Sequence, residues 1–276
     1  EHKHLLAYLV RRLLENGANT SFVNLLARKD QQVSAIIASP VEQVKSHVQH
    51  RHASIPLPVD IYPGDRKISM GMNLADSASL DPYYEYLEHI RSHSWHAKPL
   101  LGRSIQGTGE TQSVENPASP EHSPGTVQLA SEETLEVAFE EAITAFPDWD
   151  ELGGAQRAGI LEKAADLYEQ YRFELRALCQ LEAGKTLADA VAEVREAVDF
   201  LRYYAAQARE KFSAPRKMQG PTGESNEYRL SGRGVFVCIS PWNFPLAIFT
   251  GQVSAALAAG NSVLAKPAEQ TPLVAW

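Results

Sequence analysis

The amino-acid sequence predicts an α/β fold, and three patterns along the chain indicate it. An amphipathic helical pattern covers residues 4–15, two long helical patterns lie between residues 155 and about 210, and a strand–helix–strand pattern covers residues 234–266. Two strands joined by a helix are expected to pair in parallel. Parallel strands need helices on their faces, and the long helical segments can supply that cover.

Composition restricts the class of protein. The chain has 276 residues, of which 44% are hydrophobic and 22% are charged, as in ordinary globular proteins. This usage excludes a collagen, a disordered tail and a disulfide scaffold. The net charge of −8 argues against a nucleic-acid partner, because phosphate binding needs an excess of basic groups.

Cysteine usage and hydropathy indicate a cytoplasmic protein. Cys179 and Cys238 are the two cysteines, and both lie in apolar periodic segments, as expected of buried thiols in a reducing compartment. The longest apolar stretch, residues 244–259, falls short of the ~20 residues that a membrane span needs. The first residues enter a helical pattern directly, without the layout of a signal peptide.

The first helix has one polar and one apolar face, and the pair Asn16-Gly17 is expected to end it. At 100° per residue, Tyr8, Arg11, Arg12 and Glu15 share one face. The opposite face, which we expect to be packed, holds Leu6, Leu9, Val10, Leu13 and Leu14. Two adjacent arginines suit a carboxylate ligand, whereas the alternative is a solvated face with an Arg11–Glu15 pair.

The middle of the chain predicts short elements. Helices are expected at residues 40–50 and 81–93, with an irregular proline-rich segment at 55–69 between them. Two groups of histidines could supply metal ligands by their spacing, but no cysteine or clear carboxylate accompanies either group, so we interpret them as surface residues. These groups are His47, His50, His52 and His89, His93, His96.

A strand pair and three helical segments are expected next. Residues 104–119 and 126–131 predict two strands around the turn Pro124-Gly125, and Ser131 predicts the start of a helix over residues 132–146. Residues 155–182 predict one long helix with Cys179 in its core, and Gly184 then separates it from a helix that runs to about residue 210. The apolar stripes are expected to be Ile160, Ala164, Leu167, Tyr168, Tyr171, Leu175 and Leu178 in the first helix, and Val191, Val194, Val198, Leu201 and Ala205 in the second. The tripeptide Gly184-Lys185-Thr186 lacks the rest of a P-loop, so a phosphate site there is rejected.

The strand–helix–strand unit predicts a ligand site. Strands are expected at residues 234–240 and 262–266, and the helix at 246–259 ends at Gly260-Asn261. Ligands of parallel sheets bind beyond the carboxyl ends of the strands, where Asn243, Lys266 and Glu269 are expected to lie. Cys238, in mid-strand, should point into the core. The sequence lacks a GxGxxG fingerprint, so this pattern alone does not identify an ordinary dinucleotide fold.

Longer strings in the same region resemble the aldehyde dehydrogenase superfamily. They are PWNFP at 241–245, GNSVLAKPAEQTP at 260–272, and upstream VENPAS, LEAGKT and VREAVDFLRYYA, so that the resemblance covers residues 104–276. It implies that NAD lies along the strand ends. Lys266 and Glu269 match residues that hold the adenosine ribose, and Asn243 matches the side-chain amide of the oxyanion hole. The positions that line the nicotinamide half are matched by Ile239, Ser240, Pro241 and Trp242.

The segment at 193–209 resembles the branch of that superfamily that oxidises glutamate semialdehyde, the open-chain form of pyrroline-5-carboxylate. In that branch the positions of Glu196 and Phe244 lie beside the substrate. The alternative is that Glu196 forms a salt bridge on its helix and that Phe244 is an aromatic residue of the core. The resemblance also implies that the nucleophilic cysteine and the general-base glutamate follow residue 276, so this chain alone is expected to be inactive.

The string YLVRRLLENGANTSFVN at residues 8–24 resembles the last helix of the proline dehydrogenase barrel in the bifunctional proline utilization A (PutA) family. The resemblance implies that Arg11 and Arg12 hold the proline carboxylate, that Tyr8 packs on the proline ring, and that Glu15 lies near FAD. A (β/α)₈ barrel needs roughly 250 residues, so this chain cannot hold FAD by itself. The expected organisation is the barrel helix at 1–30, a connector at 31–103 and the first part of an aldehyde dehydrogenase domain at 104–276.

This family implies oxidation of proline with FAD and then oxidation of glutamate semialdehyde to glutamate with NAD. A homo-oligomer is expected, and a quinone at the membrane could accept electrons from the parent protein, which could then be peripheral to the inner membrane. One alternative is a monofunctional aldehyde dehydrogenase with another substrate, which residues 8–24 disfavour. The other alternative is a non-catalytic scaffold or a DNA-binding regulator, and this acidic chain has no segment that resembles a DNA-binding module.

Overall fold

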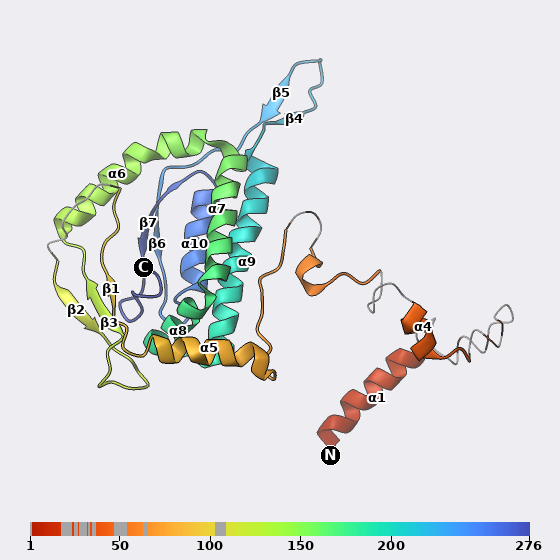
Figure 1. Cartoon of the computed structure of the whole chain (residues 1–276). Helices are drawn as coiled ribbons and strands as arrows, with labels where there is room; N and C mark the ends of the chain where they lie inside the picture. Colours follow the sequence, from red (N-terminus) through yellow and green to blue (C-terminus); the bar gives the residue numbers. More distant parts are fainter. Residues whose placement is uncertain are drawn as a thin grey trace. The chain divides into compact units, whose positions relative to one another are not determined.

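A computed structural model of the chain describes residues 2–17, 37–46, 54–62, 64, 66–102 and 109–276, together with residues 24, 27, 32 and 34. The chain divides into two units, Glu1–Pro56 and Leu57–Trp276 (Figure 1). Residues 57–103 of the expected connector therefore belong to the second unit. The predicted α/β class is confirmed.

The first unit contains helix α1 (His2–Gly17) and helix α4 (Pro40–Ser46). The predicted helix at 4–15 is confirmed. The helix includes Asn16 and Gly17, and Gly17 does not have the positive φ with which this pair was expected to end it. The helix predicted at 40–50 is seen as far as Ser46, and residues 47–50 lie outside the described residues. The expectation of a packed leucine face on α1 is wrong for the described part of the chain, where Leu6, Leu13 and Leu14 are exposed because no described element covers them.

The second unit starts with a short 3-10 helix η1 (Pro58–Asp60) inside the segment predicted to be irregular. Helix α5 (Ser77–His89) follows, and the predicted bounds of 81–93 are wrong at both ends. The helix starts earlier because the Asp76 carboxylate accepts the Ala78 N–H at 3.2 Å and so caps it. It ends at His89, and Ile90 is its C-cap residue.

Three of the predicted surface histidines are confirmed as exposed: His89, His93 and His96. They lie at the end of α5, in a loop and in a strand, so they share no helical face. The His93 ring packs edge-on against Trp95 at 4.6 Å, and the His96 Nδ1 atom lies 2.9 Å from the Thr126 hydroxyl. Among the described residues no group of three side chains could hold a metal ion. His47, His50 and His52 lie outside the described residues.

A three-stranded sheet follows, in the order β1-β3-β2. Strands β2 (Thr111–Val114) and β3 (Gly125–Gln128) form the predicted pair of strands, and the pair is antiparallel. Residues 104–108 of the predicted first strand lie outside the described residues. The parallel strand β1 (Trp95–Ala97) was not predicted, because three residues carry too little periodicity. A further hairpin, β4 (Arg216–Met218) with β5 (Asn226–Tyr228), was not predicted either.

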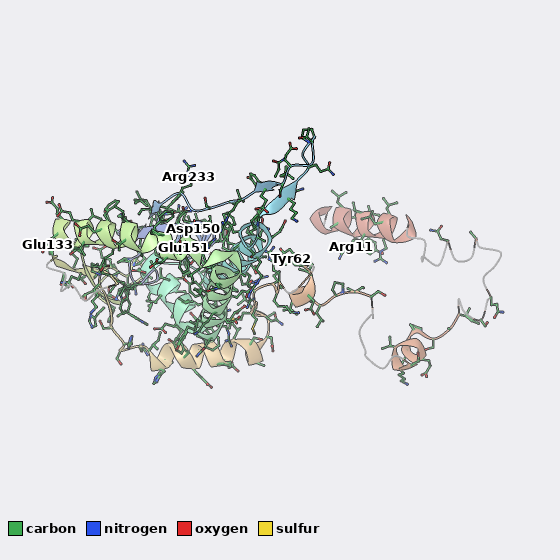
Figure 2. All side chains as sticks on the ribbon, turned by 90° about the horizontal axis from the view of Figure 1, so that it is seen from above. Arg11, Tyr62, Glu133, Asp150, Glu151 and Arg233 are labelled. Carbon is green, nitrogen blue, oxygen red and sulfur yellow. The ribbon has the colours of Figure 1, made fainter. Side chains whose placement is uncertain are left out.

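Helix α6 (Glu132–Glu151) has the predicted cap, since the Ser131 hydroxyl accepts the Thr134 N–H at 3.1 Å. It runs past Pro147 and is therefore longer than the predicted 132–146. Its end is held by Arg157, whose buried guanidinium donates to the carbonyl oxygens of Trp149, Asp150 and Ala258. Figure 2 labels Asp150 there, whose carboxylate also accepts the Gly232 N–H at 2.9 Å.

The single helix predicted at 155–182 is wrong, because the structure has two helices, α7 (Gly153–Gln170) and α8 (Arg172–Ala183). Neither Gly nor Pro marks the break at Tyr171. After the break, helix α8 runs in a different direction from α7 (Figure 1). In this direction Phe173 packs edge-on against Tyr83 of α5, with ring centroids 5.5 Å apart. Tertiary packing of this aromatic cluster therefore decides the break.

The stripe predicted for α7 is also wrong in part, since Ile160, Leu167 and Tyr171 are exposed. The buried residues of α7 are Gly154, Ala158, Leu161 and Ala165, together with the charged Arg157 and Glu169. A Cβ atom at Gly154 would collide with the carbonyl oxygen of Ala208 in helix α9 (Leu187–Phe212). Small residues are therefore needed where these two helices pack closely.

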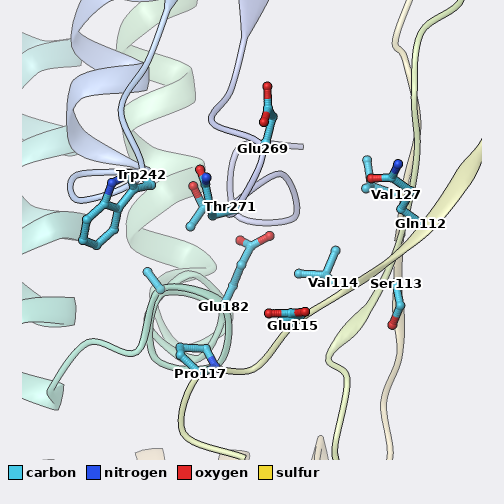
Figure 3. Close-up of a pocket in the computed structure, with 12 residues that line it drawn as sticks. Gln112, Ser113, Val114, Glu115, Pro117, Val127, Glu182, Trp242, Glu269 and Thr271 are labelled. Atoms are coloured by element: carbon cyan, nitrogen blue, oxygen red, sulfur yellow. The ribbon is translucent and has the colours of Figure 1, made fainter. Parts of the chain in front are cut away.

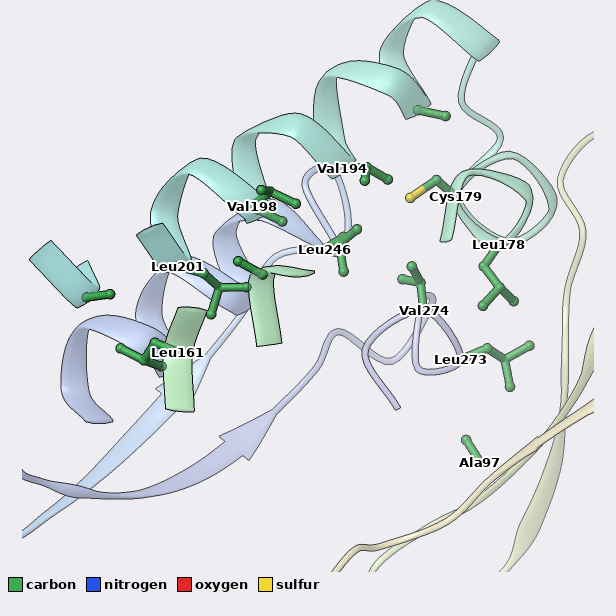
Figure 4. Packing of buried hydrophobic residues seen from close by; sticks show 14 of the residues in the cluster. Ala97, Leu161, Leu178, Cys179, Val194, Val198, Leu201, Leu246, Leu273 and Val274 are labelled. Atoms are coloured by element: carbon green, nitrogen blue, oxygen red, sulfur yellow. The ribbon is translucent and has the colours of Figure 1, made fainter. Parts of the chain in front are cut away.

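The predicted stripe of α9 is confirmed as buried. Val194, Val198, Leu201 and Ala205 of this stripe belong to the hydrophobic core cluster, and Figure 4 labels the first three. Cys179 is buried in the same cluster, as predicted. Between α8 and α9, Gly184 has φ of +64° and ends α8, while the Thr186 hydroxyl caps α9. Gly184 is thus the predicted break between two helices.

The predicted strand–helix–strand unit is confirmed. Strands β6 (Val235–Ile239) and β7 (Ser262–Lys266) pair in parallel, and helix α10 (Ala247–Ala258) connects them in the sequence. Cys238 is buried within β6. Gly260, with φ of +90°, follows the helix as expected. None of the helices in the described residues combines the length and the apolar character that a membrane crossing requires.

Candidate functional site

The candidate site lies at the edge where the parallel strands β6 and β7 end. Ile239 pairs with Lys266 in the strand register, and the Ser240 N–H donates to the Lys266 carbonyl at 3.1 Å. The segment 241–245 therefore leaves the sheet beside the segment that carries Glu269. Asn243, Lys266 and Glu269, which were predicted to lie at the strand ends, are therefore all at this edge of the sheet.

Most of these side chains are accessible. Ile239 is 65% exposed and Trp242 is 57% exposed, and Asn243 is exposed as well. The Lys266 ammonium lies 3.6 Å from the Glu269 carboxylate, and both side chains face solvent. In contrast, Ser240 is buried, and its hydroxyl has no hydrogen-bond partner within the described chain. This edge offers one cation, one carboxylate and one unsatisfied hydroxyl to a ligand.

A pocket of about 540 Å³ opens beside this edge (Figure 3). Trp242 and Glu269 were predicted to belong to the site, but the rest of the lining was not. The lining residues are Gln112, Ser113, Val114, Glu115, Pro117, Val127, Glu182, Ala183, Trp242, Glu269, Gln270 and Thr271. The pocket thus joins the three-stranded sheet, the end of α8 and the segment after β7.

Glu182 is the buried carboxylate of this pocket. Its two oxygens accept the N–H groups of Leu273 and Val274 at 2.6 and 2.9 Å. Burial raises the pKa of Glu182 to about 7, against the opposing effect of these two hydrogen bonds. The only sequence signal for it was its place in the string LEAGKT.

Glu196 and Phe244 lie near one cation, Lys185. The Lys185 ammonium is 4.5 Å from the centroid of the Phe244 ring and 3.1 Å from the Glu193 carboxylate. Burial and the neighbouring Glu193 raise the pKa of Glu196, and Lys185 opposes this. Phe244 is 41% exposed, which is more than a core aromatic residue would show. Sequence reasoning missed Lys185 and Glu193.

The polar face predicted on α1 is present in the first unit. Tyr8, Arg11 and Arg12 are exposed, and Figure 2 labels Arg11 on this helix. The Arg12 guanidinium lies 5.3 Å from the centroid of the Tyr8 ring. The Glu15 side chain lies outside the described residues. A phenol and two guanidinium groups thus lie exposed on one helix face, and guanidinium groups are typical donors to a carboxylate.

The two thiols are unsuited to nucleophilic chemistry. Cys179 is fully buried, and burial raises its pKa far above the usual range, with a further contribution from Glu193. Burial also raises the pKa of Cys238. Because the thiolate is the nucleophile, both residues are structural.

Comparisons with known proteins agree with this geometry. Residues 105–276 match the aldehyde dehydrogenase family, and residues 1–25 match proline dehydrogenase. The chain is 47% identical to the bifunctional protein PutA of Klebsiella aerogenes and to that of Escherichia coli, with 99% of the chain covered in each case. It spans only about a fifth of the length of these curated relatives, 20% in both.

A second group of relatives matches only the later part of the chain. The 1-pyrroline-5-carboxylate dehydrogenase 2 of Halalkalibacterium halodurans is 42% identical over 178 residues, which is 64% of this chain and 34% of that protein.

Solved structures match as well. Proline utilization A from Bdellovibrio bacteriovorus has a TM-score of 0.82 at 34% identity and covers 98% of this chain and 27% of its own. A 1-pyrroline-5-carboxylate dehydrogenase from Thermus, solved with bound NAD, has a TM-score of 0.72 at 33% identity over 76% of this chain and 41% of its own. The α/β unit therefore has the aldehyde dehydrogenase fold. Since the family match covers more than half of the residues, this chain belongs to the aldehyde dehydrogenase family.

Proposed function

We propose that the complete protein to which this chain belongs oxidises proline to pyrroline-5-carboxylate with FAD and then oxidises glutamate semialdehyde to glutamate with NAD. One observation carries the second activity. The turn that holds Asn243 and the cation Lys266 leave the same end of two parallel strands, in a chain of the aldehyde dehydrogenase family. The match of residues 1–25 to proline dehydrogenase supports the first activity.

The residues at the strand ends fit a dinucleotide. The unsatisfied, buried hydroxyl of Ser240 and the accessible pair Lys266 and Glu269 offer donors and acceptors to ribose and phosphate groups. We propose that Lys266 and Glu269 hold the adenosine ribose and that Ile239, Ser240, Pro241 and Trp242 line the nicotinamide half. When bound, NAD accepts the hydride from the aldehyde carbon.

Asn243 is proposed to act on the substrate oxygen. Addition of a nucleophile to an aldehyde carbon places negative charge on the carbonyl oxygen, and a preorganised amide N–H stabilises that charge. Asn243 is accessible and follows the first strand, while its neighbours Pro245 and Leu246 are buried. Glu196 and Phe244, which both lie near Lys185, are proposed to contact the substrate.

The N-terminal helix is proposed to belong to the proline site. Arg11 and Arg12 would hold the proline carboxylate, Tyr8 would pack on its ring, and Glu15 would lie near FAD. The exposed leucine face of α1 supports this, because a face with Leu6, Leu13 and Leu14 needs a packing partner such as the remainder of a barrel. FAD, when bound, accepts the electrons of proline oxidation.

The proposed organisation has residues 1–30 in the proline dehydrogenase barrel, residues 31–103 as a connector and residues 104–276 in the aldehyde dehydrogenase domain. We further propose a cytoplasmic homo-oligomer that acts on small molecules. A quinone at the inner membrane, where the complete protein would be peripheral, is the proposed acceptor of the electrons from proline.

Two assays of the complete protein test this proposal. With glutamate semialdehyde and NAD, absorbance at the NADH wavelength should rise, and with proline an artificial electron acceptor should be reduced. A simple aliphatic aldehyde is the control substrate. The proposal is wrong if the aliphatic aldehyde is oxidised at least as well as the semialdehyde, or if proline reduces no acceptor in protein that contains FAD.

A further inference from the structure

A buried ion pair, Lys185 and Glu193, holds the segment that directly follows Asn243. Glu193 lies on α9 and is 1% exposed. One of its carboxylate oxygens accepts the N–H groups of Leu246 and Ala247, at 3.3 and 2.8 Å. Leu246 is the N-cap residue of α10 and Ala247 is its first residue, and Leu246 offers no side-chain cap of its own. The carboxylate of another helix therefore supplies the cap.

Lys185 extends this contact to the preceding residue. Its ammonium lies 3.1 Å from the other carboxylate oxygen of Glu193 and 4.5 Å from the centre of the Phe244 ring. The Lys185 side chain is only 13% exposed, so its position is constrained by packing as well as by charge. The ion pair therefore contacts both ends of the segment 244–247.

The apolar core holds the same segment from a third direction. Pro245 is buried and Leu246 is 1% exposed, and Figure 4 shows Leu246 beside Val194 and Val198 of α9. Trp242 and Asn243, immediately before this segment, are exposed. The exposed Asn243 side chain thus lies directly before a backbone segment that is held on three sides.

We propose that Glu193, together with Lys185, is a positioning residue that fixes the turn 243–247 and thereby aims the Asn243 amide at the substrate oxygen. This inference rests on the proposed function of Asn243. The physical reason is that an oxyanion donor is effective only when it is held in place before the charge develops. Loss of the Glu193 carboxylate would leave two N–H groups without an acceptor and free the start of α10.

The test compares Glu193→Ala and Glu193→Gln with Glu169→Ala in the complete protein. Glu169 is a matched control, since this buried carboxylate also accepts a backbone N–H, that of Met70 at 2.6 Å, and also pairs with a cation, Arg202 at 3.6 Å. It holds the segment before α5 instead of the turn. The measurements are kcat and KM for semialdehyde and NAD, thermal stability, and hydrogen exchange of the peptide that spans residues 242–250.

Glu193→Ala should lower kcat for semialdehyde oxidation by about 10- to 100-fold and change the KM for NAD by less than about threefold. Exchange in residues 244–250 should become faster. Glu193→Gln keeps one acceptor for the N–H groups and loses the charge toward Lys185, so its kcat should lie between those of wild type and Glu193→Ala. Glu169→Ala should lose thermal stability, with kcat and the exchange of residues 244–250 as in wild type.

Equal kcat for Glu193→Ala and Glu169→Ala would overturn the proposal. If Glu193→Ala does not fold, Glu193→Gln decides, and a wild-type kcat with wild-type exchange would overturn it. If wild type does not oxidise the semialdehyde, the proposed function fails independently. In that case, faster exchange of residues 244–250 only in the Glu193 variants still supports the anchoring, and unchanged exchange refutes it.

Discussion

Asn243 and Lys266 lie at the ends of neighbouring strands, and their positions assign them different tasks. Asn243 follows β6, where the reacting carbonyl is proposed to lie, and Lys266 ends β7 with its ammonium 3.6 Å from Glu269. A change at one strand end should therefore affect turnover, and a change at the other should affect binding of the dinucleotide.

In the complete protein, Asn243→Ala should lower kcat for semialdehyde oxidation by roughly 10²- to 10³-fold, because one donor to the oxyanion is lost. The KM for NAD should stay close to that of wild type. Steady-state kinetics with both substrates varied measure the two effects separately.

Lys266→Ala is the matched comparison and should show the converse, a raised KM for NAD with a smaller change in kcat. If Asn243→Ala weakened NAD binding and left turnover intact, Asn243 would be a cofactor or turn residue and the oxyanion role would be wrong.

Arg11 and Arg12 make the same kind of test possible for the proline site. Replacement of either by Met removes a guanidinium and keeps an apolar stem, so the KM for proline should rise about tenfold or more, about 1.4 kcal/mol. Semialdehyde oxidation in the same protein is the internal control and should not change. If proline kinetics were unchanged in both variants, Arg11 and Arg12 would not bind the carboxylate, and this helix face would simply be solvated.

Among the elements, the junction of α8 and α9 depends on one glycine. Gly184 has φ of +64°, and a Cβ atom there would lie 2.9 Å from Cγ of Pro117. Gly184→Ala should lower the free energy of unfolding by at least about 1–2 kcal/mol, since a left-handed conformation alone costs that much for a residue with a Cβ atom. Urea unfolding measures this loss.

Gly159→Ala in α7 is the control for that substitution. Gly159 lies inside a helix, and a Cβ atom there would meet nothing within 4 Å. The variant should gain roughly 0.5–1 kcal/mol, because Ala favours the helix interior over Gly. If the two substitutions changed the free energy of unfolding by similar amounts, the left-handed conformation and the close contact at Gly184 would not determine stability.

Glu182 makes the contact between α8 and the segment after β7 sensitive to pH. Its pKa is raised from 4.5 to about 7, so between these values the folded state keeps a proton that the unfolded state has lost. Its contribution to stability is thus present at low pH and decreases as pH rises from about 4.5 to about 7.

Glu182→Gln removes this titration and keeps one acceptor for the N–H groups of Leu273 and Val274. The stability of wild type relative to the variant should therefore fall between pH 5 and pH 7.5, as urea unfolding at the two pH values can measure. A difference that stays constant with pH would show that Glu182 titrates alike in both states.

At the scale of the whole chain, the two thiols predict the behaviour of the isolated 276-residue protein. Cys179 and Cys238 are buried and their pKa values are raised, so neither supplies a thiolate. The isolated chain should form no NADH from NAD and glutamate semialdehyde, and a thiol reagent should label both cysteines only in denaturant. NADH formation, or rapid labelling of the native chain, would contradict this expectation.

Periodicity and local chemistry were sufficient to predict much of the fold. The parallel pair β6 and β7, the stripe of α9, the cap at Ser131 and the glycine break at residue 184 all follow from short-range patterns, and all are confirmed. The same strand–helix–strand pattern placed Asn243, Lys266 and Glu269 at one edge. Short strands such as β1 could not be found, because three residues carry no usable period.

The sequence by itself determined the class of fold, the strand ends at which a ligand can bind, and the strings that resemble known families. Only the tertiary structure decided which face of α7 is buried, where the helix predicted at 155–182 breaks, and that Glu193 caps α10 while Lys185 contacts Phe244. The physical reason is range. Helix and strand patterns depend on neighbours a few residues apart, whereas these contacts join residues more than fifty positions apart, and a single sequence carries no local signal for them.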